Sequence, residues 1–218
     1  IKDVIHAYRI PILEMPGFEA DDVIGTLATE AGKQGIKTYM MTPDKDYGQL
    51  VTENALIYRP KFGDKEFEVM GIERVKEKFG IEHPEQVIDL LGLMGDSSDN
   101  IPGCPGVGEK TAQKLIAEYG DIPTLLARRD ELKGALKKKV EENVELIELS
   151  RFLATIKTDV PMEFDAQALV YQDKDWDKLA PLYRELEFNS LLKQAPNNEE
   201  KTQKSKVKIL NCSSWCSS

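Results

Sequence analysis

The 218-residue sequence predicts an α/β fold in which a small layer with parallel strands is followed by an almost wholly helical region. Residues 10–41 have the pattern of a strand, a helix and a second strand, an order that favours parallel pairing. From residue 71 onward, apolar residues recur at helical spacing in one segment after another. Between two of these helical segments lies a turn rich in glycine and proline, residues 101–108.

The first part of the chain is expected to alternate short strands with helices. Val4, Ile5 and Tyr8 indicate a helix at the start, and a longer helix follows the sequence EADD. Glycines at 32 and 35 are expected to end that longer helix. The predicted strands are IPILE (10–14), IKTYMM (36–41), ALIYRP (55–60) and EFEV (66–69), and a turn at FGD joins the last two.

The later part is expected to be helical as far as residue 192. Pro181 should kink or split the last helix, because proline removes a hydrogen bond from a helix interior. The predicted helices are residues 71–80, 84–95, 109–120, 122–128, 135–156 and 175–192. We therefore predict three parts: a strand-containing core over 1–82, a helical region over 83–194 and a flexible polar tail over 195–218.

Composition narrows the class of protein. No apolar run is long enough to span a membrane, and the start of the chain lacks the pattern of a signal peptide. Three cysteines, Cys104, Cys212 and Cys216, fit a reduced cytosolic protein, so a cytoplasmic location is expected. The net charge of −9 by itself argues against a nucleic-acid partner, although a dense acidic metal site would hide a basic surface elsewhere. Because Ile1 lies inside an apparent helix, we expect a fragment of a longer protein.

Acidic residues gather in three short groups. Each group has an ordinary explanation, since acidic residues at a helix start stabilise the helix dipole by about 0.3–1 kcal/mol and aspartates are common in turns after strands. The groups are Glu19, Asp21 and Asp22 in FEADDV; Asp44 and Asp46 in TPDKDY; and Asp96 and Asp99 in GDSSDN.

The predicted sheet brings the first two groups together. Strands at 10–14 and 36–41 would deliver them to one edge, where open α/β sheets bind ligands. Carboxylates about 5 Å apart repel by roughly 3 kcal/mol at an effective dielectric constant near 20, so convergence calls for cations. Oxygen ligands, with neither His6 nor His83 among them, favour Mg²⁺ or Mn²⁺ over zinc.

The turn IPGCPGVGEKTA, residues 101–112, has the features of an anion site. Its glycines permit positive φ and close backbone approach, and its N–H groups, with those of the next helix, can bind a phosphate. The alternative is a plain interhelical turn with Lys110 in solvent. We predict a helix–hairpin–helix DNA-binding element comprising Gly103, Pro105, Gly106, Val107, Gly108, Lys110 and Thr111. The lysines at 137–139 either add phosphate contacts or form a solvated helix face.

Carboxylates and phosphates can share a site when metal ions lie between them. The acidic groups and the hairpin together therefore predict a metal-dependent nuclease. The principal alternative is a DNA-binding relative without catalytic activity, but a pure binder would gain nothing from the seven carboxylates named above. An acidic helical module for protein partners would leave both features unexplained.

The motifs FEADDVIGTLA, TPDKDYGQLV and LGLMGDSSDNIPGCPGVGEKTAQKLI resemble the 5′→3′ exonuclease domain of bacterial DNA polymerase I, a member of the flap endonuclease family. The resemblance runs from about residue 1 to residue 194. It implies a PIN-like α/β nuclease core followed by a helical region with a helix–three-turn–helix. It also implies a first metal site around Glu19, Asp21 and Asp22, and a second site with its outer shell formed by Asp44, Asp46, Asp96 and Asp99.

The resemblance also implies a function in replication and repair. The expected activity is hydrolysis of DNA, or of an RNA primer, at a 5′ flap or in a nicked or RNA-primed duplex, with two Mg²⁺ or Mn²⁺ ions. K⁺ is expected at the carbonyls of Gly103–Gly108, and polymerase domains are expected in the same protein. Two further aspartates and a basic arch of the family would precede Ile1, so we leave open whether the 218-residue chain cleaves DNA by itself.

Overall fold

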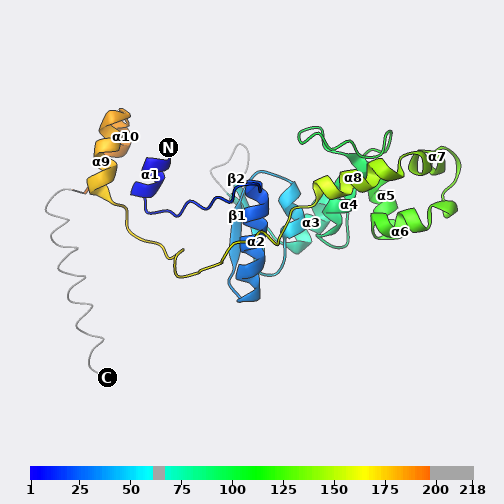
Figure 1. The fold of residues 1–218 in the computed structure, drawn as a ribbon, viewed down its shortest axis with the longest axis horizontal. Coiled ribbons are helices and arrows are strands. Elements are labelled where there is room, and N and C mark those ends of the chain that lie inside the picture. Colours follow the sequence, from blue (N-terminus) through cyan, green and yellow to red (C-terminus); the bar gives the residue numbers. More distant parts are fainter. Residues whose placement is uncertain (61–66, 197–218) are drawn as a thin grey trace, which may run out of the picture. The chain divides into compact units, whose positions relative to one another are not determined.

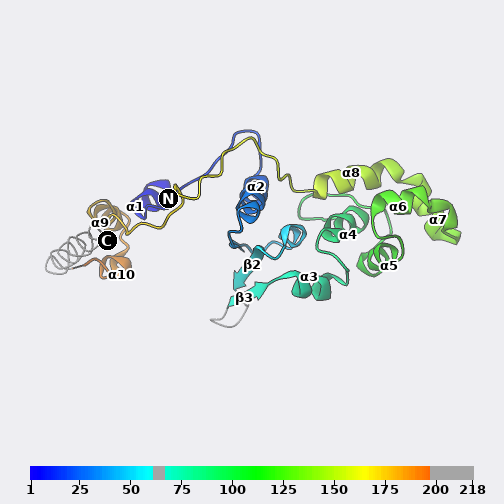
Figure 2. The same ribbon diagram turned by 90° about the horizontal axis from the view of Figure 1, so that it is seen from below.

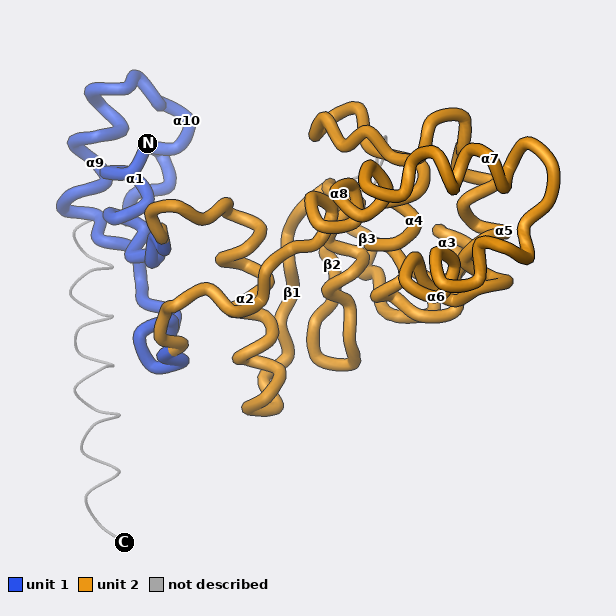
Figure 3. The backbone as a smooth tube through the Cα atoms, turned by 45° about the vertical axis from the view of Figure 1, so that its right-hand side comes forward, with its two compact units in different colours: residues 1–13, 165–218 blue, residues 14–164 orange. Residues whose placement is uncertain are grey.

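The chain, described by a computed structural model over residues 1–60 and 67–196, divides into two compact units (Figures 1 and 3). The larger unit comprises residues 14–164, and the smaller unit combines residues 1–13 with the described residues from 165 onward. The elements of the larger unit are α2 (Ala20–Lys33), β1 (Thr38–Met41), the 3₁₀ helix η1 (Asp46–Leu50), β2 (Ala55–Pro60), β3 (Phe67–Met70), α3 (Ile72–Phe79), α4 (Gln86–Met94), α5 (Glu109–Tyr119), α6 (Ile122–Ala127), the 3₁₀ helix η2 (Arg129–Glu131), α7 (Gly134–Glu142) and α8 (Val144–Ala154).

The sheet of the larger unit is mixed and has the strand order β1-β2-β3. β1 runs parallel to β2, with Thr38 opposite Ala55, and β3 runs antiparallel to β2. Residues 42–54, which contain η1, form the crossover between the parallel strands. This crossover is long enough for a parallel connection, and it carries Asp46 away from the end of β1.

The strand predicted at residues 10–14 is absent, and this prediction was wrong. Ile10 and Leu13 are 51% and 43% exposed, so the apolar run is not a buried one. Pro11 also has no N–H to donate to a strand ladder. The other predicted strands and helices are present with small shifts of their ends, except that the helices predicted over 135–156 and 175–192 are each divided in two. The predicted turn at FGD lies outside the described residues.

Helix α4 is the centre of the helical part of the larger unit, and it contacts α5, α6 and α8 (Figure 2). Its residues Leu90, Leu91 and Leu93 are fully buried. α8 approaches α4 closely at Gly92, where an added Cβ would lie 3.0 Å from the Cα of Arg151. The loop that begins at Gly95 therefore starts from the end of a tightly packed helix.

The helix predicted over residues 135–156 is two helices, α7 and α8, with a break at Asn143. The side chain of Asn143 donates to the carbonyl of Lys139 at 2.8 Å, and its φ of −126° is not helical. Asparagine competes in this way for backbone groups that a continuous helix would use. The break turns α8 back along α4.

The smaller unit contains α1 (Lys2–Ala7), α9 (Trp176–Glu185) and α10 (Asn189–Leu192), packed around Ala7, Leu179 and Tyr183. The predicted helix over 175–192 is split into α9 and α10, but Pro181 lies inside α9, so the predicted cause of the split was wrong. The break lies beyond Pro181, at Glu187, which has a φ of 55°. Among the helices of the described residues, none has the length and apolar character needed to cross a membrane.

Candidate metal centre and nucleic-acid interface

Three carboxylates from two separate loops meet in the larger unit. Among the described residues, Asp46, Asp96 and Asp99 each offer one oxygen that lies within 4.8 Å of the others. Asp46 begins η1, and the other two belong to the loop after α4. Asp96 and Ile101 close that loop by exchanging two backbone hydrogen bonds, of 2.9 and 2.8 Å. The second and third acidic groups of the sequence therefore converge.

Asp46 is the member of this cluster whose buried carboxylate is least well satisfied by its surroundings. It is 9% exposed, and its Oδ1 atom has no hydrogen-bond partner within the described chain. Burial, followed by the charges of Asp44 and Asp96, raises the pKa of Asp46 to about 7. Asp44 also accepts a hydrogen bond from the N–H of Asp46 at 3.0 Å. A buried oxygen without a donor is costly, and a cation would satisfy it.

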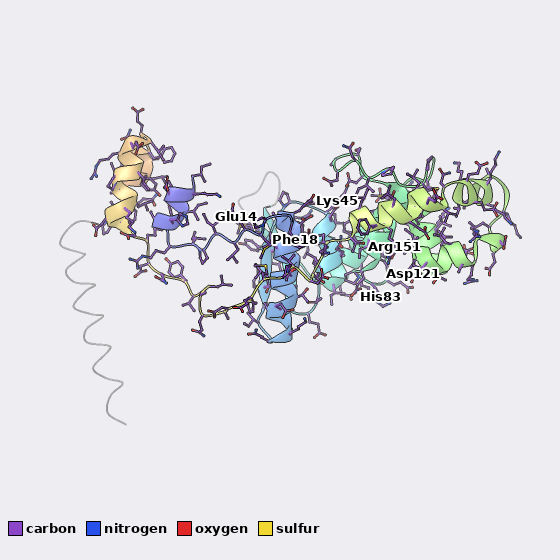
Figure 4. All side chains as sticks on the ribbon, viewed as in Figure 1. Glu14, Phe18, Lys45, His83, Asp121 and Arg151 are labelled. Atoms are coloured by element: carbon purple, nitrogen blue, oxygen red, sulfur yellow. The ribbon has the colours of Figure 1, made fainter. Side chains whose placement is uncertain are left out.

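A lysine neutralises part of the cluster. Lys45 Nζ lies 2.5 Å from Asp96 Oδ2, and the Asp96 side chain is 3% exposed. Burial alone would raise the pKa of Asp96, but hydrogen bonds from Lys45 and Ser98 outweigh it and lower that pKa. In Figure 4, Lys45 is labelled between α2 and the C-terminal end of α8. Sequence reasoning missed Lys45, although its position between Asp44 and Asp46 was a usable signal.

The first acidic group lies at the start of α2 and is not part of this cluster. Glu19 and Asp22 form a capping box, and Asp22 also accepts from the N–H of Lys157 at 2.8 Å. The expected meeting of Glu19 with Asp46 depended on the absent strand at 10–14. Burial, followed by the charge of Asp21, raises the pKa of Tyr47, the residue after Asp46, to about 12. The assignment of this group as metal ligands remains a prediction.

The donor set of the cluster fits a hard divalent cation. It offers carboxylate oxygens and neither sulfur nor imidazole among the described residues, which suits Mg²⁺ or Mn²⁺. The buried Oδ1 atom of Asp46, which has no hydrogen-bond partner, is an available ligand for such a cation. These side chains could therefore hold a divalent ion.

The hairpin at residues 101–108 is packed against the end of α4. Gly103 has a φ of 64°, and an added Cβ there would lie 2.4 Å from the backbone nitrogen of Gly95. Gly106 also has a positive φ, of 75°. Gly108 differs, because its φ is −98° and no atom lies within 4 Å of an added Cβ. Two of the three hairpin glycines are therefore required by the fold, and Gly108 is not.

The predicted DNA-binding residues separate into buried anchors and an exposed edge. Val107 is buried with Cys104, so its side chain packs in the core. Thr111 is half-buried in the first turn of α5. The exposed residues of this edge are Pro102, Pro105, Gly106, Gly108, Glu109 and Lys110.

The structure distinguishes the lysines near this edge. Lys137 pairs with Asp130 at 3.1 Å, and Lys138 pairs with Glu142 at 3.7 Å, which favours a solvated helix face for both. Lys139 instead donates to the carbonyl of Gly106 at 2.9 Å. Lys110 forms no ion pair within the part of the chain that the structure describes. Lys110 and Lys139 are thus the cations available to a phosphate at the hairpin.

Buried polar side chains connect the hairpin with η1. The N–H of Gly103 donates to Ser150 Oγ on α8 at 2.9 Å. At the end of α8, Gln49 of η1 donates to the carbonyl of Ala154 and accepts from the N–H of Ile156, both at 2.9 Å. Nothing in their spacing marked these residues as important. They fix the hairpin and the Asp46 loop to the same helix.

Comparison with known proteins agrees with this architecture. The DNA polymerase I of Bacillus caldotenax is 41% identical over 95% of this chain, which spans about a quarter (24%) of that relative. Among solved structures, T5 5′-exonuclease with bound zinc has a TM-score of 0.61 at 23% identity. The matched region covers 68% of this chain and 54% of the T5 chain. The Rad2 catalytic core in complex with DNA has a TM-score of 0.55 at 20% identity and covers 84% of this chain and 60% of its own.

Two family models match consecutive parts of the sequence. The N-terminal resolvase-like domain of 5′-3′ exonucleases matches residues 1–80, and the C-terminal SAM fold of 5′-3′ exonucleases matches residues 82–177. These matches confirm the resemblance seen in the motifs and the α/β core followed by a helical region. The chain belongs to the 5′-3′ exonuclease family.

Proposed function

We propose that the chain is the nuclease part of a longer protein and hydrolyses phosphodiesters near a 5′ end or a 5′ flap. The observation that carries this proposal is the convergence of Asp46, Asp96 and Asp99. The loop that holds two of them runs directly through Ile101 and Pro102 into the hairpin. A DNA strand whose backbone phosphate is bound at the hairpin edge would therefore also pass close to the carboxylates.

The carboxylates would hold two divalent ions, Mg²⁺ or Mn²⁺. Asp46, Asp96 and Asp99 would hold one, with Asp44 in its outer shell, and Glu19, Asp21 and Asp22 would surround the other. Such ions, when bound, lower the pKa of a water and neutralise charge on the phosphate. The zinc in the T5 5′-exonuclease structure supports divalent binding in this fold.

The hairpin would position the substrate. The N–H groups of Gly106, Gly108 and the start of α5 suit a backbone phosphate, whereas that of Val107 donates to the carbonyl of Cys104 at 2.9 Å. Lys110 and Thr111 lie beside them. K⁺ would bind the hairpin carbonyls, with the Gly106 carbonyl shared with Lys139. We propose 5′-flap, nicked or RNA-primed duplexes as substrates. This proposal is supported by the Rad2 core, which was solved with DNA.

The parent protein would carry polymerase domains and act in replication and repair in the bacterial cytoplasm. The support is that two curated relatives, 41% and 44% identical to this chain, are DNA polymerase I chains, of which this chain matches 24% and 22%. The tail proposed for residues 195–218 would then be a linker.

The test is cleavage of a 5′-end-labelled flap DNA by the 218-residue chain in Mg²⁺, in Mn²⁺ and in EDTA. We expect cleavage that requires a divalent ion and falls at least tenfold in Asp46→Asn. Asp130→Asn is the matched control, because Asp130 is 88% exposed and lies on η2.

Cleavage that persists in EDTA, or that Asp46→Asn lowers less than tenfold, would overturn the metal assignment. Metal-dependent flap binding without cleavage, both by this chain and by the longer protein, would favour the alternative of a non-catalytic DNA-binding relative.

A further inference from the structure

We propose that Lys45 is an internal counterion that occupies the carboxylate cluster in the metal-free protein and competes with the divalent ion for Asp96. The proposal rests on the proposed function in one respect, namely that the cluster binds a divalent ion. It concerns how strongly the ion binds and how the protein remains folded without it.

Lys45 uses the carboxylate oxygen that is otherwise left for a metal. The Oδ1 atom of Asp96 already accepts a hydrogen bond from the N–H of Ser98 at 2.8 Å. The Oδ2 atom is the one that Lys45 Nζ approaches, at 2.5 Å. An ion shared by Asp46, Asp96 and Asp99 would therefore meet the ammonium at the less occupied oxygen of Asp96.

The position of Lys45 suits a reversible contact. Its side chain is 38% exposed, whereas that of Asp96 is 3% exposed, so the lysine reaches from the surface to a buried partner. Lysine carries its charge on a flexible four-carbon stem, and exposure leaves room for the ammonium to withdraw.

The charges of the cluster explain why a divalent ion would displace Lys45 from Asp96. Lys45 is attracted by Asp44 and Asp46 as well as by Asp96. One ammonium offsets a single negative charge of the cluster and leaves Asp46 Oδ1 without a partner. A divalent ion would offset two charges and could contact Asp46 as well. The divalent ion therefore replaces Lys45, but with an affinity reduced by the competition.

The experiment compares wild type with Lys45→Met in the 218-residue chain. Binding of Mn²⁺ is measured by titration calorimetry at constant ionic strength, and thermal unfolding is followed in EDTA and in excess Mn²⁺. We expect the Kd for Mn²⁺ to fall about tenfold in Lys45→Met. We also expect its Tm in EDTA to fall by about 3 °C, and excess Mn²⁺ to remove this difference.

Two further variants serve as controls. Lys76→Met removes a lysine of similar side-chain exposure, 32%, that pairs with Glu73 on α3. It should leave the Kd for Mn²⁺ unchanged. Lys45→Arg keeps the charge, and its Kd should remain within about twofold of wild type, since the competing cation is retained.

A Kd in Lys45→Met that equals that of Lys76→Met, or that is weaker than wild type, would overturn the proposal. A wild-type chain that binds no Mn²⁺ at all would instead contradict the proposed function. If Lys45→Met does not fold in EDTA, the side-chain ammonium resonance of Lys45 in wild type decides, with Lys45→Arg to assign it. This resonance should shift and exchange faster as Mg²⁺ saturates the site, and an unchanged resonance would contradict the competition.

Discussion

At the scale of single residues, the charge of Asp46 suits metal binding but destabilises the folded protein when no metal is bound. Its pKa is raised from 3.8 to about 7, so the folded chain binds this proton more tightly than the unfolded chain. The stability that Asp46 contributes is therefore fully present below pH about 4 and is lost as the pH rises through about 7. The metal-free protein thus holds an ionised carboxylate at an energetic cost at pH 8.

Asp46→Asn should therefore stabilise the metal-free protein at pH 8. The amide keeps the size of the side chain and removes the charge, so we expect a gain on the order of 2 kcal/mol at pH 8 and about a quarter of that gain at pH 4.5. Urea unfolding in EDTA at both pH values measures this difference. Addition of Mg²⁺ at pH 8 should raise the Tm of wild type more than that of the variant. A loss of stability of equal size at both pH values would contradict the role given to the Asp46 charge.

The hairpin glycines have separable roles. Gly103→Ala combines a positive φ with a Cβ 2.4 Å from Gly95, so we expect it to cost at least about 2 kcal/mol of unfolding free energy. Gly108→Ala has room and an ordinary φ, and should cost no more than about 0.5 kcal/mol. It should nevertheless weaken flap-DNA binding if a phosphate approaches this backbone. Equal unfolding free energies for both variants would show that the hairpin is not held against α4.

At the scale of elements, Gln49 fixes η1 to the end of α8. Gln49→Leu would leave the N–H of Ile156 and the carbonyl of Ala154 without partners in a buried place. We expect a loss of about 3 kcal/mol, because each unsatisfied buried group costs about 1–3 kcal/mol. Gln113→Leu is the control, since Gln113 makes one such bond, to the carbonyl of Phe79. Urea unfolding should rank Gln49→Leu as the more damaging change, and the reverse order would contradict the connection.

The sequence predicted elements well where local chemistry decides them. Helix α2 begins at a capping box, and Gly35 follows its end. The prediction of a strand at IPILE, residues 10–14, was wrong, because a strand needs a neighbouring strand that the local sequence pattern does not reveal. Sequence reasoning also missed the break at Asn143, where one side-chain hydrogen bond outweighs an unbroken apolar period.

The site was predictable to a similar degree. Each acidic group was visible as a motif, but which groups converge depended on the crossover and on the loop closed by Asp96 and Ile101. Lys45 and Gln49 act through contacts with residues distant in the chain, such as Asp96 and Ala154. The position of Lys45 between Asp44 and Asp46 marks it as a candidate, but spacing along the sequence does not show which distant residue Lys45 or Gln49 contacts.

At the scale of the whole molecule, a net charge of −9 is compatible with DNA binding because charge is distributed unevenly. Much of the negative charge is paired locally, as in the contacts of Glu68 with Arg59 and Arg74. The carboxylate cluster concentrates more of it in one place. The exposed edge of the hairpin keeps Lys110 unpaired within the described residues, so phosphate attraction is local.

This distribution predicts a shallow salt dependence of DNA binding. Each phosphate contact contributes about 0.9 to the slope of log K against log salt, and a few lysines at the hairpin would supply the contacts. Lys110→Ala should reduce the slope by about 1 and weaken binding at low salt. Lys138→Ala, whose lysine pairs with Glu142, should change neither. Fluorescence anisotropy with a flap DNA in EDTA, over a range of KCl concentrations, measures both slopes. Parallel lines for wild type and Lys110→Ala would place the phosphate contacts on another surface of the chain.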